Sequence, residues 1–186
     1  MSYTSQYPPA QSNTYVKATS TYNDWYPYNT TNPAKSLIGA DAGNSWQCGS
    51  GLSTNQRFHI DLGSAKVIKR IYYENQHNAG LYTEYGAKNF TFWGSNTADA
   101  FADLVYGDNT NWTQLTTSAS LFDRHVAANQ ADPKYITVTN TTAYRYYAFK
   151  FADTWGGGGM VVRRIELQIE EGTAILANRG LFTFHG

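Results

Sequence analysis

The sequence predicts an all-β domain, a sandwich or barrel of short antiparallel strands, from three observations. Stretches that alternate apolar and polar residues recur along the chain, and long polar loops rich in turn-forming residues separate them. Only 15% of the residues are charged, below the roughly 25% of an average soluble domain. The polar surface is therefore built from Asn, Ser, Thr and Tyr, which favour turns and pleated strands. Many short strands joined by such loops are typical of β-sandwiches and barrels.

The alternation predicts eight strands, and it also predicts which face of each strand is buried. The strands are expected at 15–21, 58–62, 67–73, 89–93, 112–115, 135–138, 145–151 and 165–169. Only 98–104 and 121–128 suggest a short helix. The apolar faces define an expected core of Phe58, Ile60, Leu62, Ile71, Phe90, Phe92, Tyr147, Phe149, Ile165 and Leu167. Further buried or nearly buried residues are expected at Trp46, Cys48, Trp93 and Trp112.

The 186 residues fit one domain, and a chain of this length buries roughly 70% of its unfolded surface on folding. We divide it into an extended N-terminal arm (1–13), the β-sandwich (14–170) and a C-terminal extension (171–186). Residues 1–33 contain seven Tyr or Trp but only two charged residues, Lys17 and Asp24. Because exposed apolar surface usually marks contacts, we expect this segment or the extension to pack on another subunit.

Charge and hydropathy argue against two classes of partner, nucleic acids and the membrane interior. Lysine plus arginine equals aspartate plus glutamate at 14 each, whereas nucleic-acid binding normally requires an excess of basic residues. No apolar run approaches the roughly 20 residues that span a bilayer, and the N-terminus has no secretory signal pattern. We therefore expect neither nucleic-acid binding nor membrane insertion.

The order of the motifs resembles the discoidin family, also called the coagulation-factor type C domains, which has the galactose-binding-like fold. The motifs are SLIGADAGNSW (36–46), FHIDLG (58–63), FTFWGS (90–95), WTQL (112–115), RYYAF (145–149) and IEL (165–167). They follow the family's order and spacing over roughly residues 14–170. The resemblance implies an eight-stranded jelly roll whose loops at one end bind glycans, lipids or protein surfaces.

The resemblance also implies a structural calcium ion between the loop before Trp46 and a glutamate on the last strand. The matching positions are Asp41, Asn44 and Glu166. Relatives usually carry a first aspartate where this chain has Gly39, so one charged ligand is missing. The alternative is a loop held by its own Asx turns, with Glu166 as a solvated strand residue.

Two loops offer the chemistry of a glycan site, in which an aromatic ring stacks on a sugar and polar groups bind its hydroxyls. A glycine run at 156–159 would let the backbone approach a ligand closely, and loop 22–32 offers Trp25 and Tyr26 as further aromatics. The alternative is that these aromatics cap the sandwich or contact another chain. The candidate ligand residues are Asn75, His77, Tyr82 and Tyr85 in loop 75–88, and Asp153 and Trp155 in loop 152–160.

No catalytic motif accompanies these loops. The four histidines lack metal-ligand spacing, and the sequence contains neither a Gly-x-Ser-x-Gly elbow nor a phosphate-binding loop. We therefore expect a non-catalytic glycan-binding module, extracellular or virion-associated, with calcium as its only cofactor. The alternative is a structural or decoration protein of a phage-like virion or surface assembly, in which the same fold contacts protein partners or further copies of itself.

Overall fold

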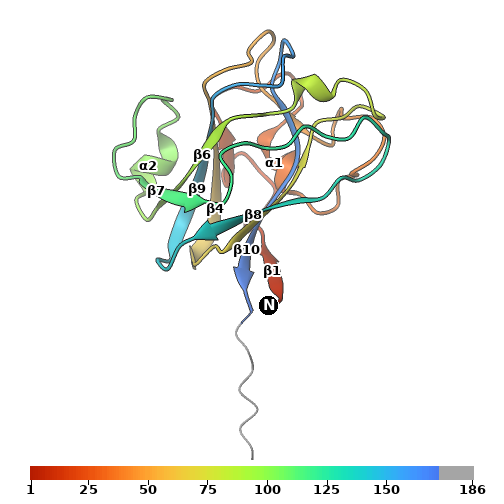
Figure 1. Ribbon diagram of the computed structural model, residues 1–186. Coiled ribbons are helices and arrows are strands. Elements are labelled where there is room, and N and C mark those ends of the chain that lie inside the picture. The colour runs from red at the N-terminus through yellow and green to blue at the C-terminus, as the bar shows by residue number, and fades with distance from the viewer. Residues whose placement is uncertain (172–186) are drawn as a thin grey trace, which may run out of the picture.

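The computed structural model describes residues 1–171 and shows an all-β fold (Figure 1). The predicted fold class is confirmed. The strands are β1 (Tyr3–Gln6), β2 (Val16–Ala18), β3 (Trp46–Gln47), β4 (Gln56–Lys66), β5 (Arg70–Asn75), β6 (Phe90–Ser95), β7 (Thr113–Thr117), β8 (Lys134–Thr139), β9 (Tyr144–Phe151) and β10 (Val161–Glu170). Short helices occur at α1 (Pro27–Thr31), η1 (Thr83–Tyr85) and α2 (Ala98–Ala102). The helix suggested at 98–104 is thus present as α2, whereas 121–128 contains no helix.

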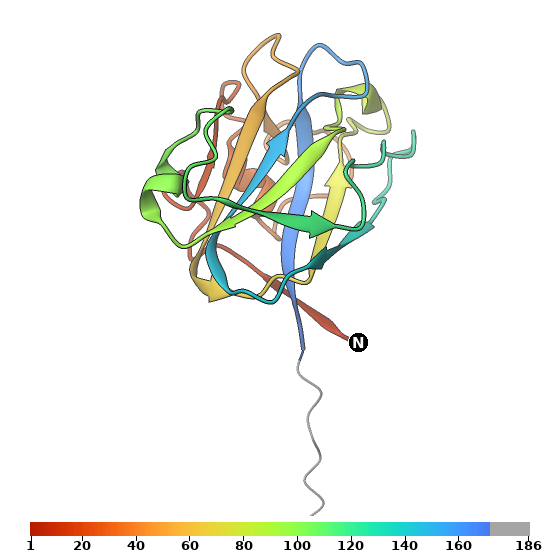
Figure 2. The same ribbon diagram turned by 60° about the vertical axis from the view of Figure 1, so that its left-hand side comes forward.

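All strands pair antiparallel in one curled sheet, in the order β1-β10-β5-β8-β7-β6-β9-β4-β2, with β3 added to β10. The curl brings β4, β9 and β6 over β10 and β5, so that the two halves enclose the core (Figure 2). Each of the eight predicted strands overlaps an observed one. The additional strands β1 and β3 are short, and both pair with β10.

The predicted core is confirmed, because all ten of its apolar residues are buried. On β9, Tyr147, Phe149 and Phe151 belong to the main cluster, whereas Tyr146 and Ala148 face a second, smaller cluster. This is the period of two that a strand requires. The burial expected for the three tryptophans and the cysteine is also observed. Trp46, Cys48 and Trp112 are buried, and Trp93 is packed against the smaller cluster.

The N-terminal strand is attached to the sheet of its own chain, since Tyr3 of β1 lies opposite Glu170 of β10. The guanidinium of Arg70 lies between two aromatic rings, 3.9 Å from the centroid of Tyr3 and 4.5 Å from that of Tyr135. These contacts give the arm an intramolecular position, and its predicted contact with another subunit stays a prediction. Of the C-terminal extension, 172–186 lies outside the described residues. Within residues 1–171, no helix is long and apolar enough to cross a membrane.

Candidate functional site

The two loops expected to carry the site lie at the same end of the sandwich, far from the N-terminus (Figure 1). Loop 76–89 connects β5 to β6 and contains η1, and loop 152–160 connects β9 to β10. Backbone hydrogen bonds join them, from the Trp155 N–H to the Gly86 carbonyl at 3.2 Å and from the Gly157 N–H to the Glu84 carbonyl at 2.9 Å. The loops therefore support each other and form one surface.

Gly157 shows what the glycine run does. A Cβ atom at this position would lie 2.7 Å from both Cα and Cγ of Tyr85, closer than side-chain atoms normally approach. At Gly157 the backbone closely approaches Tyr85 of the same chain, whereas the expected approach was to a ligand. Gly157 allows loop 152–160 to pack directly on η1, and this packing fixes where Tyr85 stands.

A hollow of about 170 Å³ opens at this end of the molecule. Tyr82 is 53% exposed, and its ring stands nearly perpendicular to that of Tyr85, with 6.0 Å between the ring centroids. We call this feature the tyrosine hollow. Its lining residues are Asp41, Gln47, Gln76, Tyr82, Tyr85 and Val161.

Gln76 gives the tyrosine hollow its polar character. Its side-chain NH₂ group donates a hydrogen bond to the carboxylate of Asp41, which fixes the orientation of the amide because a carboxylate accepts and cannot donate. The amide oxygen Oε1 is buried and finds no hydrogen-bond partner within the described chain. Gln76 is 1% and Asp41 7% exposed. Next to the carboxylate of Asp41, Gln76 Oε1 is therefore a buried acceptor without a partner among the described residues.

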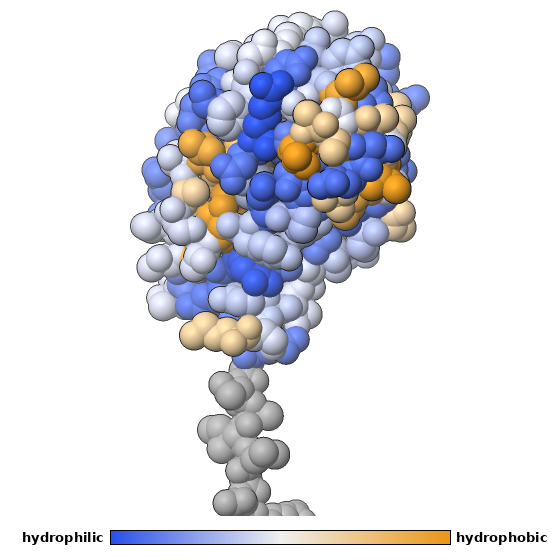
Figure 3. Space-filling view, turned by 45° about the vertical axis from the view of Figure 1, so that its right-hand side comes forward, coloured by the Kyte–Doolittle hydropathy of each residue, from blue (hydrophilic) through white to orange (hydrophobic). Residues whose placement is uncertain are grey.

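Three neighbouring loops carry exposed apolar residues on this side of the molecule. The loops are joined by hydrogen bonds from the Gly39 N–H to Asn129 Oδ1 at 2.7 Å and from the Ala79 N–H to the Gly39 carbonyl at 2.9 Å. Figure 3 shows apolar residues gathered among hydrophilic ones on this side. The exposed apolar residues of the three loops are Ile38, Leu81 and Val126.

Asn75 and His77 are buried, and their polar atoms are used inside the protein. Asn75 Nδ2 donates to the carbonyls of Ala87 at 2.8 Å and Asp123 at 2.9 Å. His77 Nε2 lies 2.8 Å from the carbonyl of Leu37, and its ring stacks on another histidine ring. Burial lowers the pKa of His77, which favours the neutral imidazole. Both side chains hold the loops in place and do not line the tyrosine hollow.

Asp153 and Trp155 also have partners within the chain. The Asp153 carboxylate accepts hydrogen bonds from the backbone and side-chain N–H groups of Asn89, both at 2.9 Å. The indole N–H of Trp155 donates to the carbonyl of Phe122 at 3.0 Å, and the ammonium of Lys88 lies 4.8 Å from the ring centroid. Neither residue lines the tyrosine hollow.

Of the six predicted ligand residues, the structure thus brings Tyr82 and Tyr85 together in the tyrosine hollow. The other lining side chains were missed or were assigned another role. Gln47 follows the buried Trp46 on β3, and the alternation of a strand was a usable signal that it points away from the core. No sequence signal separates Gln76 from its polar neighbours. Asp41 is the residue that the family resemblance assigns to calcium.

The three side chains expected to bind calcium are all hydrogen-bonded within the protein. A calcium ion takes six to eight oxygen ligands. Asp41 already accepts the amide hydrogen bond described above, Asn44 Oδ1 accepts from the Ser36 N–H at 3.1 Å, and Glu166 is bonded to Arg164 Nη1 at 3.2 Å. Within residues 1–171, no group of three or more His, Cys, Asp or Glu side chains is arranged to hold a metal ion.

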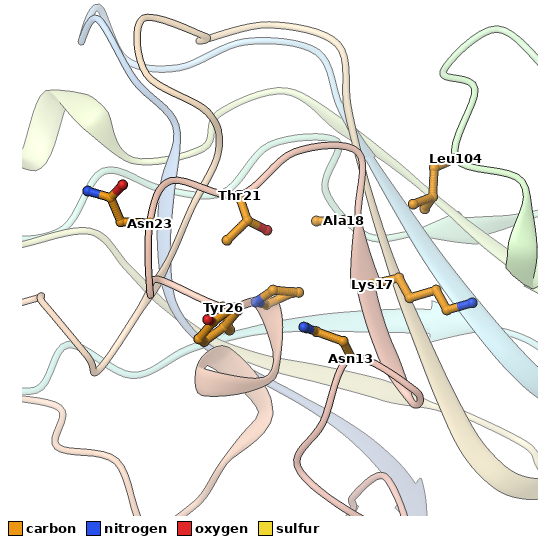
Figure 4. Close-up of a pocket in the computed structure, with 8 residues that line it drawn as sticks. Asn13, Lys17, Ala18, Thr21, Asn23, Tyr26 and Leu104 are labelled. Atoms are coloured by element: carbon orange, nitrogen blue, oxygen red, sulfur yellow. The ribbon is translucent and has the colours of Figure 1, made fainter.

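A second hollow, of about 310 Å³, lies beside β2 and α1 (Figure 4). The ring of Tyr26 is stacked on Tyr28 with centroids 5.1 Å apart, and the ammonium of Lys17 lies 4.7 Å from the ring centroid of Phe101. None of the buried unpaired polar atoms found in residues 1–171 belongs to its lining, so the tyrosine hollow is the better candidate site. The second hollow is lined by Asn13, Lys17, Ala18, Thr21, Asn23, Tyr26, Pro27 and Leu104.

Solved structures of carbohydrate-binding modules share this fold. A family 32 module of C. perfringens NanJ in complex with galactose is 13% identical over 83% of this chain and 92% of its own, with a TM-score of 0.56. The family 32 module of AlyQ in complex with 4,5-unsaturated mannuronic acid is 16% identical over 87% and 96%, with a TM-score of 0.54. A pectin-binding module is 17% identical over 92% and 95%, with a TM-score of 0.54. At these identities the likeness shows the fold, and it confirms the galactose-binding-like fold that the sequence motifs implied.

Sequence comparison gives the family. No curated protein matches the chain. The profile of the family DUF5000, described as a domain of unknown function, matches residues 35–168, which is well over half of the chain and runs from the loop before Trp46 to β10. The chain therefore belongs to the DUF5000 family, and its fold is the galactose-binding-like β-sandwich of the family 32 carbohydrate-binding modules.

Proposed function

We propose that this domain is a non-catalytic, extracellular module that binds glycans in the tyrosine hollow. The observation that carries the proposal is the buried, unpaired Oε1 of Gln76 beside the carboxylate of Asp41. Buried polar atoms in proteins almost always have a partner, so an unpaired acceptor in a hollow indicates that a ligand supplies the donor. Sugar hydroxyls are such donors, and the exposed ring of Tyr82 offers a flat apolar surface for the C–H face of a sugar.

The fold supports this function without specifying the sugar. The modules compared above bind galactose, an unsaturated mannuronic acid and pectin, so modules of this fold bind neutral as well as acidic carbohydrates. The virion alternative has no comparable support among these structures, and we therefore prefer the glycan-binding module.

The lining residues favour a class of sugar. Asp41 and Gln76 Oε1 are acceptors, so we infer that neutral or amino sugars bind better than uronic acids, whose carboxylate would meet the charge of Asp41 at short range. A volume of about 170 Å³ is below the roughly 300–1,000 Å³ of pockets for drug-sized ligands. The tyrosine hollow therefore suits one sugar residue, such as the end of a glycan chain.

The other predicted ligand residues have a supporting role in this proposal. The side chains of Asn75, His77, Asp153 and Trp155 form hydrogen bonds within the protein, with partners at Ala87, Leu37, Asn89 and Phe122 respectively. They hold Tyr82 and the remaining lining residues in position and do not contact the sugar.

The test is isothermal titration calorimetry with neutral, amino and acidic monosaccharides. Tyr82→Ala is expected to weaken binding of the best sugar roughly 5- to 30-fold, the equivalent of about 1–2 kcal/mol for an aromatic contact. Tyr135→Ala is the matched control, because Tyr135 is 54% exposed, like Tyr82, but lies on β8. Binding of no sugar by the wild type, or equal affinities of the two variants, would contradict the proposal.

A further inference from the structure

Arg163 on β10 is a fully buried cation, with 0% of its surface exposed. A buried charge normally requires a partner of opposite charge, because its transfer from water is costly. Arg163 forms no ion pair with the described carboxylates. Its guanidinium donates instead to backbone carbonyl oxygens.

Four carbonyls surround the guanidinium. Nη2 donates to Gly39 at 2.8 Å and to His77 at 3.1 Å, and Nη1 donates to Ser36 at 3.2 Å and to Ile38 at 3.4 Å. Three of these oxygens come from the loop before Trp46, and the fourth comes from the start of the loop that contains η1. One side chain therefore ties two loops to the last strand.

As in a calcium site, loop oxygens converge here on a buried positive charge. Burial lowers the pKa of Arg163, while the negative charges of Asp41 and Glu74 nearby act in the opposite direction and favour the charged form. Gly39 adopts a φ of +76°, which glycine tolerates best. The residue that replaces the aspartate of relatives thus presents a carbonyl to the guanidinium.

The glutamate that the family resemblance assigns to calcium is occupied in the same way. Glu166 accepts hydrogen bonds from Arg164 Nη1 at 3.2 Å and from Ser5 Oγ at 2.6 Å. The same arginine donates through Nη2 to the carbonyl of Lys35 at 2.6 Å. Arg163 and Arg164, which are consecutive on β10, therefore both donate hydrogen bonds to backbone carbonyls of the segment 35–39.

We propose that the guanidinium of Arg163 takes the place of a structural calcium ion in this domain. It fastens loop 36–39 to β10 and to the backbone of His77, and it thereby fixes the loop that carries Asp41 into the tyrosine hollow. The domain has no use for calcium. The proposal is independent of glycan binding, because its tests measure stability and amide exchange.

The first test uses the wild-type protein alone. We expect the same melting temperature in excess calcium chloride and in excess EDTA, and no heat of binding when calcium is titrated. A calcium ion at one hundred times its dissociation constant would raise the melting temperature of a domain of this size by roughly 5–10 °C. A rise of that kind, or a fall in EDTA, would overturn the proposal.

The second test is amide hydrogen exchange in Arg163→Met, which keeps an unbranched apolar stem and removes the charge. The amides of Ser36, Ile38 and Gly39 are hydrogen-bonded to side chains, and we expect them to exchange at least about tenfold faster once their loop has lost its bonds to the guanidinium. Arg145→Met is the control, since Arg145 is bound to Asp61 at 2.8 Å on the other half of the sheet.

Arg163→Lys keeps the test decisive if the methionine variant does not fold. Its single ammonium group lacks the planar fork of the guanidinium, so it cannot reproduce all four bonds. We expect faster exchange at Gly39 than in the wild type, without any response to calcium. Exchange at Gly39 unchanged from the wild type in Arg163→Lys, or in Arg163→Met where that variant folds, would refute the role of Arg163.

Discussion

Gly157→Ala offers a direct test of how the tyrosine hollow is built. The new methyl carbon would lie 2.7 Å from Cα and Cγ of Tyr85 and 2.9 Å from its backbone nitrogen. Because two of these atoms belong to the backbone, rotation of a side chain cannot relieve the contact. Forcing extra atoms into a packed site costs about 1–3 kcal/mol, which for a domain of this size lowers the melting temperature by roughly 2–12 °C.

Gly158→Ala is the matched control, because a Cβ atom at the neighbouring position would meet nothing within 4 Å and its φ lies outside the left-handed region. This variant is expected to be neutral or more stable by about 0.4–1 kcal/mol, since alanine restricts the unfolded chain. Urea denaturation and sugar titration of both variants provide the assay. Equal stability and equal sugar affinity of the two variants would refute the inferred packing of loop 152–160 on Tyr85.

Three further predictions concern the core, the pH response and the arm. Phe149→Ala should cost about 3–5 kcal/mol in urea denaturation, because Phe149 is fully buried against Phe92 at a centroid distance of 4.7 Å; a loss below about 1 kcal/mol would contradict this packing. Burial lowers the pKa of His59 to about 3 in the folded protein. Between about pH 6.5, the ordinary pKa of histidine, and pH 3, this side chain therefore takes up a proton only in the unfolded state. Stability should then fall by up to about 1.4 kcal/mol per pH unit between about pH 6.5 and pH 3, and denaturation of His59→Gln at several pH values should give a shallower slope. Deletion of residues 1–6 should lower the melting temperature because β1 pairs with β10; a lower mass in light scattering would instead support the predicted subunit contact.

The sheet was predictable because strand alternation is a local signal. Phe58, Ile60 and Leu62 repeat every second residue, and the pleat of β4 turns all three into the core. β1 has no such pattern. It is a strand because its backbone pairs with β10, more than 160 residues away in the sequence, and no local feature of Tyr3–Gln6 records that partner.

The site was less predictable, because the sequence does not show which polar groups are already hydrogen-bonded. Asn75 and Gln76 are adjacent amides in the same segment, yet Asn75 is bonded to two carbonyls whereas Gln76 Oε1 has no partner in residues 1–171. The same limit applies to the expected metal site. Gly39 in place of an aspartate was a visible departure from the family pattern, but the carbonyls that surround Arg163 belong to the backbone, which leaves no signature in the sequence.

The pairing of β1 with β10 also determines how the domain can be tethered. Tyr3 lies opposite Glu170, and both are at the end of the sandwich away from η1 (Figures 1 and 2). A surface, a label or a fusion partner attached next to either residue would therefore leave the tyrosine hollow facing outward. Copies anchored side by side in this way would present their hollows in the same direction, an orientation in which weak single contacts add up to firm attachment to a repetitive polymer.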